Sequence, residues 1–89
     1  MTKERADREE KTLRRRLAAN LRRLREARDL TQEELAHRAN LHSSLLQRLE
    51  AGELNTTIRT ICRLAAGLDV PAAELLSDSE RAARRAVAE

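Results

Sequence analysis

The chain has 89 residues, of which 40% are hydrophobic and none is aromatic, so it suits one small domain with a leucine and alanine core. Charged residues make up 37% with a formal net charge of +3, and no apolar run approaches the ~20 residues of a membrane span. A single cysteine excludes an internal disulfide and the charged N-terminus lacks the apolar stretch of a signal peptide, so we expect a cytoplasmic protein.

Positive charge is concentrated at the start of the chain. Residues 1–29 contain eleven Lys or Arg against six Asp or Glu, whereas residues 30–56 contain two against four. Residues 57–89 contain five of each sign. Any basic surface therefore belongs to the first predicted helix and the N-terminal tail before it.

The first predicted helix covers residues 12–28, because leucines recur there at steps of four, four and three: Leu13, Leu17, Leu21 and Leu24. Residues 1–11 are a charged N-terminal tail, of which residues 3–11 either extend this helix or remain frayed. Asp29 ends the pattern, since Asp tolerates the left-handed conformation that a helix end often needs.

Two short helices are predicted next. Thr31 and Glu34 form a capping box that opens a helix over residues 32–38. Asn40 suits a sharp turn with positive φ. A third helix covers residues 43–51 and ends at Gly52, with His42 or Ser43 as its weak N-cap.

The rest of the chain continues the helical pattern. Thr56 and Thr57 open a fourth helix, with Gly67 interpreted as a helix stop and with one apolar face made of Ile58, Ile61, Cys62, Ala65 and Leu68. Pro71 starts a short fifth helix that ends at Leu76. The prediction is an all-α fold, a compact five-helix domain over residues 12–76. A capping box at residues 77–80 is consistent with a sixth helix in the C-terminal extension 77–89; its apolar side, a dimer seam or a docked face, holds Ala82, Ala83, Ala86 and Val87.

The second and third helices have the spacing of a helix-turn-helix. Leu46 and Leu49 face the core, and Leu41 fills the gap between the two helices. The opposite face of the third helix carries short or hydrogen-bonding side chains, namely Ser43, Ser44, Gln47 and Arg48.

These residues resemble the phage Cro/cI repressor-like helix-turn-helix family, also called XRE-like, from about Leu17 to Leu76. The most specific parts are residues 30–36 and the Leu49-Glu50-x-Gly52 sequence. Residues 39–42 and 55–58 are also similar to controller proteins of restriction–modification systems. The resemblance implies a transcriptional regulator that binds duplex DNA as a homodimer on a palindromic operator. An autoregulator is expected, either a restriction–modification controller or an antitoxin with a toxin as its protein partner.

The resemblance also implies roles for individual residues. The base edges would be contacted by Ser43, Ser44, Gln47 and Arg48, with Arg48 pairing with guanine. Phosphates would be contacted by Gln32, Asn55, Arg22 and Arg23. Arg25 and Glu50 would form a structural ion pair. Two departures from the family pattern are the acidic Glu53 in a loop that is often basic, and the small Ser43 where relatives carry bulky side chains.

A second class of function stays open, a protein-interaction module that keeps the fold without specific DNA binding. The net charge of −2 over residues 30–56 favours it. No enzyme is expected, because no nucleophile–base pair, acid pair or glycine-rich phosphate loop is present. No metal or cofactor is expected either, since His37, His42 and Cys62 lack a zinc-site spacing. Cys62 is interpreted as a small buried core residue.

Overall fold

The computed structural model describes residues 2–78, and every regular element within that range is helical. In chain order the elements are α1 (Lys3–Ala27), α2 (Gln32–Ala39), α3 (Ser43–Glu50), α4 (Ile58–Leu68) and the 3-10 helix η1 (Ala72–Leu76). The all-α prediction is confirmed, although the fifth helix is of the 3-10 type with Pro71 at its N-cap. The predicted sixth helix falls on residues that, beyond Asp78, lie outside the described range.

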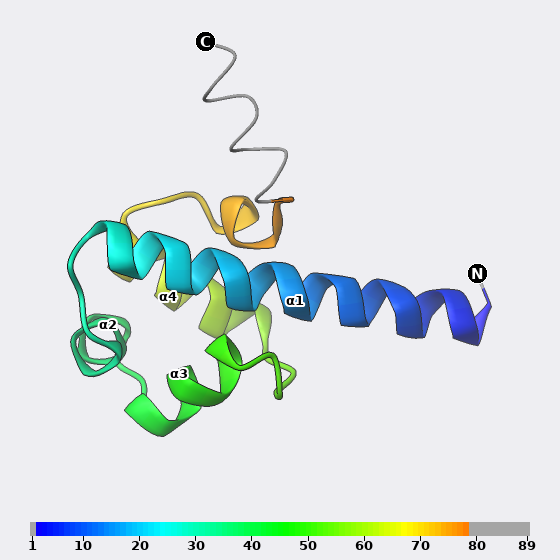
Figure 1. Ribbon diagram of the computed structural model, residues 1–89, viewed down its shortest axis with the longest axis horizontal. Coiled ribbons are helices and arrows are strands. Elements are labelled where there is room, and N and C mark those ends of the chain that lie inside the picture. The colour runs from blue at the N-terminus through cyan, green and yellow to red at the C-terminus, as the bar shows by residue number, and fades with distance from the viewer. Residues whose placement is uncertain (1, 79–89) are drawn as a thin grey trace, which may run out of the picture.

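Helix α1 starts earlier than the leucine pattern indicated. Thr2 caps it by accepting a hydrogen bond from the backbone N–H of Arg5 at 3.2 Å, so residues 3–11 extend the helix instead of fraying. The first buried residue of α1 is Leu17, and the turns before it project from the domain (Figure 1). We call residues 3–16 the α1 arm.

The core lies between α1 on one side and α2, α3 and α4 on the other, with η1 packed against α1 and α4 (Figure 1). Each helix contributes a leucine with 0% exposure, namely Leu21, Leu35, Leu46, Leu64 and Leu75. Small residues allow the short helices to approach closely, since Ala36 and Ala39 of α2 are buried as well. Branched aliphatic side chains therefore fill a core that contains no aromatic ring.

All four α-helices end in the same way. Asp29, Asn40, Gly52 and Asp69 follow the helices with φ values from 53° to 72°. After each of them, the next N–H reaches back to a carbonyl of the last helical turn at 2.8–3.1 Å, which is the Schellman arrangement. The left-handed conformations predicted for Asp29 and Asn40 are confirmed.

The prediction that Gly67 stops the fourth helix is wrong, because α4 continues to Leu68 and ends at Asp69. Gly67 instead lies where α2 crosses α4. A Cβ atom at this position would lie 3.2 Å from Leu35 Cδ1 and 3.4 Å from Arg38 Cβ. The glycine therefore permits the close contact between the two helices.

The predicted apolar face of α4 is wrong at two positions. Cys62 is exposed, and Ile58 is exposed over 73% of its surface. The buried stripe follows the i, i+3, i+4, i+7 spacing instead, with Ile61, Leu64, Ala65 and Leu68. Cys62 lies about 100° around the helix from Ile61, and Ile58 lies in the first turn, beyond the edge of the core.

One buried polar side chain was not anticipated. Asn20 of α1 has 0% exposure, and its Nδ2 donates to the carbonyl oxygens of Leu75 and Ser77 at 2.9 Å and of Glu74 at 3.2 Å. Its Oδ1 accepts from Arg23 at 3.1 Å. Asn20 thus fastens the end of η1, together with Ser77 that follows it, to α1.

Candidate nucleic-acid interface

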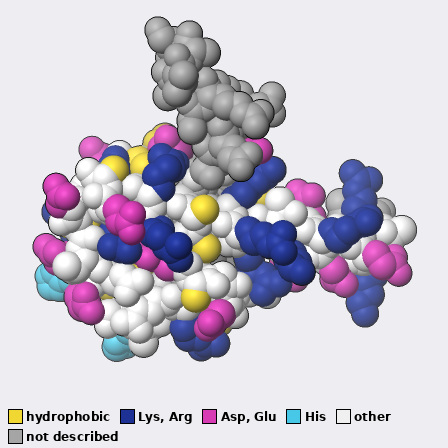
Figure 2. Space-filling model, in the orientation of Figure 1, with side chains coloured by type: hydrophobic (Ala, Val, Ile, Leu, Met, Phe, Trp, Pro, Cys, Tyr) yellow, Lys and Arg dark blue, Asp and Glu magenta, His cyan; other side chains and the backbone are white. Residues whose placement is uncertain are grey.

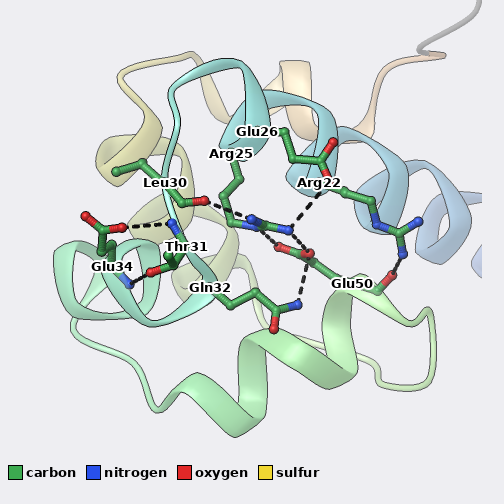
Figure 3. A network of polar contacts seen from close by, with 8 residues as sticks. All are labelled: Arg22, Arg25, Glu26, Leu30, Thr31, Gln32, Glu34 and Glu50. Atoms are coloured by element: carbon green, nitrogen blue, oxygen red, sulfur yellow. Dashed lines mark hydrogen bonds and ion pairs between the residues drawn. The ribbon is translucent and has the colours of Figure 1, made fainter.

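Helix α2, the first helix of the predicted helix-turn-helix, begins with a complete capping box. Thr31 Oγ1 accepts from the N–H of Glu34 at 3.1 Å, and the N–H of Thr31 donates to Glu34 Oε1 at 3.0 Å (Figure 3). This hydrogen bond from the Thr31 backbone lowers the pKa of the Glu34 carboxyl, because it stabilises the charged form. The start of α2 is therefore fixed by local interactions, as the sequence predicted.

The turn between α2 and α3 is short and tightly bonded. Asn40 has a φ of 57°, and the N–H of Leu41 donates to the carbonyl of Ala36 at 2.8 Å. Leu41 is half-buried against the core and fills the space between the two helices. His42 occupies the N-cap of α3 without a side-chain hydrogen bond, so α3 depends on its packing more than on its cap.

The C-terminus of α3 is held by a buried ion pair. Glu50 is only 3% exposed, and its carboxylate accepts two hydrogen bonds from Arg25, from Nε at 2.7 Å and from NH2 at 2.9 Å (Figure 3). Arg25 NH1 also donates to the carbonyl of Leu30 at 2.8 Å. The structure thus brings Arg25 and Glu50 together in the pair that the family resemblance implied. The hydrogen bond to Glu50 raises the pKa of the Arg25 guanidinium.

Two more side chains complete this network. Gln32, at the start of α2, donates from Nε2 to Glu50 Oε1 at 3.1 Å. Arg22 donates from NH2 to the backbone carbonyl of Glu50 at 2.9 Å. The network therefore joins α1, the α1–α2 turn, α2 and the end of α3, and it fixes the orientation of α3 relative to the rest of the domain (Figure 3).

The outward edge of α3, unlike this internally bonded network, is polar and largely exposed. Ser44, Gln47 and Arg48 are exposed and Ser43 is half-buried, while Leu46 and Leu49 face the core. None of these four polar side chains makes a hydrogen bond or ion pair with another residue of the range 2–78. A rigidly held helix thus presents polar groups that remain available to an external partner.

The four predicted phosphate-contacting residues differ from the α3 side chains in that they are already bonded within the protein. Each already makes an internal hydrogen bond: Gln32 and Arg22 to Glu50, Arg23 to Asn20, and Asn55 to Glu10 Oε1 at 2.9 Å. Arg22, Arg23 and Asn55 are exposed, whereas Gln32 is half-buried. A phosphate would have to share these groups with their internal acceptors. Sequence reasoning could not find these competing bonds, because each of them except that of Arg23 joins segments far apart in the chain.

Charge is distributed in space as the sequence indicated. Lys and Arg side chains gather along α1 in Figure 2, interspersed with carboxylates on the α1 arm. The exposed Glu53, just after α3, adds negative charge near the end of the outward edge. Long-range attraction of a polyanion would therefore depend mainly on α1.

Other kinds of site find no support in the described range. Within residues 2–78, no group of three or more His, Cys, Asp or Glu is arranged to hold a metal ion. No helix of that range has both the length and the apolar character required to cross a membrane.

Comparison with known proteins points to one group. Residues 16–77 match the family model of a helix-turn-helix domain. The restriction–modification controller protein C.AhdI from Aeromonas hydrophila is 35% identical, with a TM-score of 0.68 over 70% of this chain and 94% of that one. A hypothetical transcription factor, NHTF from Neisseria, is 32% identical, with a TM-score of 0.77 over 81% of this chain and 83% of that one. The clp gene regulator ClgR from Corynebacterium glutamicum is 27% identical, with a TM-score of 0.69 over 85% of this chain and 86% of that one. No curated protein matches the chain.

Proposed function

Because the chain belongs to the helix-turn-helix family of DNA-binding transcriptional regulators, we propose that it acts in the cytoplasm as a homodimer on a palindromic operator. In this arrangement α3 of each subunit enters the major groove, in two half-sites about 34 Å apart along the duplex. The observation that carries the proposal is the contrast between the two sides of α3. Its end is fixed by the buried Arg25–Glu50 pair, while its outward polar side chains have no partner among residues 2–78.

The outward side chains suit different parts of the recognition. Arg48 has a planar fork of donors and suits a bidentate contact with guanine, worth about 1–3 kcal/mol of discrimination. Gln47 suits adenine, whereas Ser43 and Ser44 reach only short distances and specify less. Arg22, Arg23, Gln32 and Asn55 would contact phosphates and set the overall affinity.

The finer assignment that we favour is a controller that regulates its own promoter. Its support is the similarity to C.AhdI, which covers 70% of this chain and is named as a restriction–modification controller. An antitoxin with a toxin partner uses the same DNA-binding arrangement. The adjoining gene distinguishes the two functions: a restriction enzyme gene indicates a controller, and a toxin gene indicates an antitoxin.

The test is a selection of binding sites from a random duplex library, followed by a salt titration on the selected duplex and on an unselected one. We expect a palindromic site and a steep loss of affinity as salt rises. Arg48→Ala should relax the preference at one base pair per half-site, whereas Gln32→Ala should weaken binding to all sequences similarly. Arg63→Ala removes the same charge from an exposed position of α4 and is the matched control.

Two results would count against the proposal. If neither Arg48→Ala nor Gln32→Ala changed DNA binding, the assignment of α3 to the major groove would be wrong. If the wild-type protein bound no duplex at low salt, the acidic residues 30–56 would instead favour a protein-interaction module.

A further inference from the structure

One face of α1 carries a row of positive charge that runs from the body of the domain onto the α1 arm. Its members recur at steps of three, four and seven residues, so they lie within about 60° of one another around the helix axis. All are exposed, and the row extends over about 21 Å. We call it the basic stripe: Arg8, Lys11, Arg15 and Arg22. Its three outer members precede residue 16, where the helix-turn-helix match begins.

Negative charge is absent from this face between the two ends of the stripe. The carboxylates between Arg8 and Arg22 are Glu9 and Glu10. Both lie at least about 100° around the helix from every member of the stripe. Figure 2 shows Lys and Arg side chains gathered along this part of the helix. An anion that approaches this face therefore meets positive charge over about four helical turns.

The outer members of the stripe have no partner among the described residues. The side chains of Arg8, Lys11 and Arg15 make no hydrogen bond or ion pair with any residue of the range 2–78. Glu4 and Asp7 each precede a member of the stripe by four residues, but within that range neither forms an ion pair with it. Three exposed cations therefore remain available to an external anion.

The inner end of the stripe lies at the end of α3. Arg22 donates to the carbonyl of Glu50, the last residue of α3, at 2.9 Å. Farther along the arm, Asn55 of the α3–α4 loop donates to Glu10 at 2.9 Å, and this bond holds the arm beside the loop. A duplex that contacts Arg22 and Asn55, as proposed above, is thereby brought next to the arm.

The helix-turn-helix itself supplies little positive charge. Residues 30–56 contain Arg38 and Arg48 against four Asp or Glu, and one of these acids, Glu53, is exposed just after α3. Neutralisation of phosphates by Lys and Arg supplies essentially all of the sequence-independent affinity for DNA. That contribution must come from another part of the chain, and the basic stripe is both exposed and adjacent to α3.

We propose that the α1 arm is a second DNA-contacting surface, on which Arg8, Lys11 and Arg15 bind phosphates beside the base pairs that α3 reads. The inference rests on the proposed function and deepens it, because it names the part of the chain that supplies affinity without sequence preference. The hydrogen bond between Asn55 and Glu10 holds the arm in place before DNA binds, so less conformational freedom is lost on binding.

The test is fluorescence anisotropy of a dye-labelled selected duplex, titrated with the full chain at salt concentrations from about 50 to 400 mM. Lys11→Gln combined with Arg15→Gln should reduce the slope of log K against log[salt] by about 1.8, since each phosphate contact contributes about 0.9. The affinity at about 50 mM salt should fall at least about tenfold. Adding Arg8→Gln should reduce the slope by about 0.9 more.

Two control variants separate the position of the charge from its amount. Arg38→Gln combined with Arg63→Gln removes the same charge from exposed positions of α2 and α4, and it should leave the slope within about 0.5 of wild type. Lys11→Arg combined with Arg15→Lys keeps both charges of the stripe, and it should bind within about twofold of wild type. Far-UV circular dichroism of every variant confirms that the fold is retained.

Ethylation interference separates direct contact from long-range attraction, because it removes the charge of one phosphate at a time. We expect about two phosphates per half-site at which ethylation weakens binding by wild type but not by the variant with Lys11→Gln and Arg15→Gln. The preference of this variant for the selected duplex over an unselected one should stay within about threefold of wild type, because phosphate contacts carry no sequence information.

Two results would overturn the proposal. One is a Lys11→Gln, Arg15→Gln variant that binds DNA as the Arg38→Gln, Arg63→Gln control does, and the other is an interference pattern that is the same for this variant and for wild type. If Arg48→Ala still relaxed the sequence preference in either case, the proposed function would stand without the arm. A wild-type protein that preferred no duplex sequence, but lost affinity and phosphate contacts when the stripe was changed, would refute the sequence-specific regulator and support the arm contact.

Discussion

Replacing Arg25 by alanine strands the carboxylate of Glu50 in a site where it is only 3% exposed. The carboxylate loses two hydrogen bonds from a charged donor, of 2.7 and 2.9 Å, and the carbonyl of Leu30 loses a third of 2.8 Å. Removing one member of a buried ion pair typically costs about 3–5 kcal/mol. A chain of this size has a free energy of unfolding of roughly 5–13 kcal/mol. We therefore expect Arg25→Ala to remove a large part of the stability.

Two further variants separate the ion pair from the space that it fills. Arg25→Lys keeps the charge but lacks the planar fork that reaches both Glu50 oxygens, so we expect a loss of about 1–3 kcal/mol. Arg25→Met combined with Glu50→Leu removes both charges and retains the volume, and it should be less destabilised than Arg25→Ala. Arg28→Ala at the exposed end of the same helix is the control, with an expected cost below about 1 kcal/mol.

The assay is urea unfolding followed by far-UV circular dichroism, since the chain has no tryptophan or tyrosine to report by fluorescence. Loss of less than about 1 kcal/mol in Arg25→Ala would refute the view that this pair holds α3. The same conclusion would follow if the double variant Arg25→Met with Glu50→Leu were no more stable than Arg25→Ala. The unpaired Glu50 carboxylate would then not be the cause of the lost stability.

Three further outcomes are expected from urea or thermal unfolding. Asn20→Ala should lower the free energy of unfolding by about 2–4 kcal/mol. Asn20→Asp should lower it at least as much, because a carboxylate oxygen would replace the amide group that donates to three carbonyl oxygens. Either variant being as stable as wild type would contradict this prediction. Gly67→Ala should not give the gain of about 1 kcal/mol expected in an open helix, because the new methyl group would lie 3.2 Å from Leu35 Cδ1; a full gain would show that α2 moves away freely. Glu34 has a pKa below its ordinary value of 4.5, so its stabilising effect is present above that pH and is lost as pH falls through the lowered pKa. The difference in Tm between wild type and Glu34→Ala should therefore narrow from about pH 7 to about pH 2, and a constant difference would argue against the charged capping box.

Many features of the fold could be predicted from the sequence because they depend on residues that are close together along the chain. The Thr31–Glu34 capping box, the left-handed Asn40 and the inward leucines of α3 each involve groups within about one helical turn of each other. The helical state of the α1 arm was also readable in principle. Glu4 and Arg8, and likewise Asp7 and Lys11, have the i, i+4 spacing with the acid first that favours a helix.

Other features were decided by which segments meet in three dimensions. Whether Gly67 ends a helix or allows a crossing depends on the position of α2, and the exposure of Ile58 and Cys62 depends on where the core ends. The carbonyl oxygens that Asn20 binds lie more than fifty residues away in the chain. An apolar groove lined by Leu13, Leu54 and Ile58 likewise exists only because the projecting α1 arm passes beside the α3–α4 loop. Sequence periodicity determined the helices and the outward residues of α3, since both follow from 3.6 residues per turn. Only the tertiary structure decided which polar groups are bonded internally and which remain available, because those hydrogen bonds join residues that packing, and not sequence order, brings together.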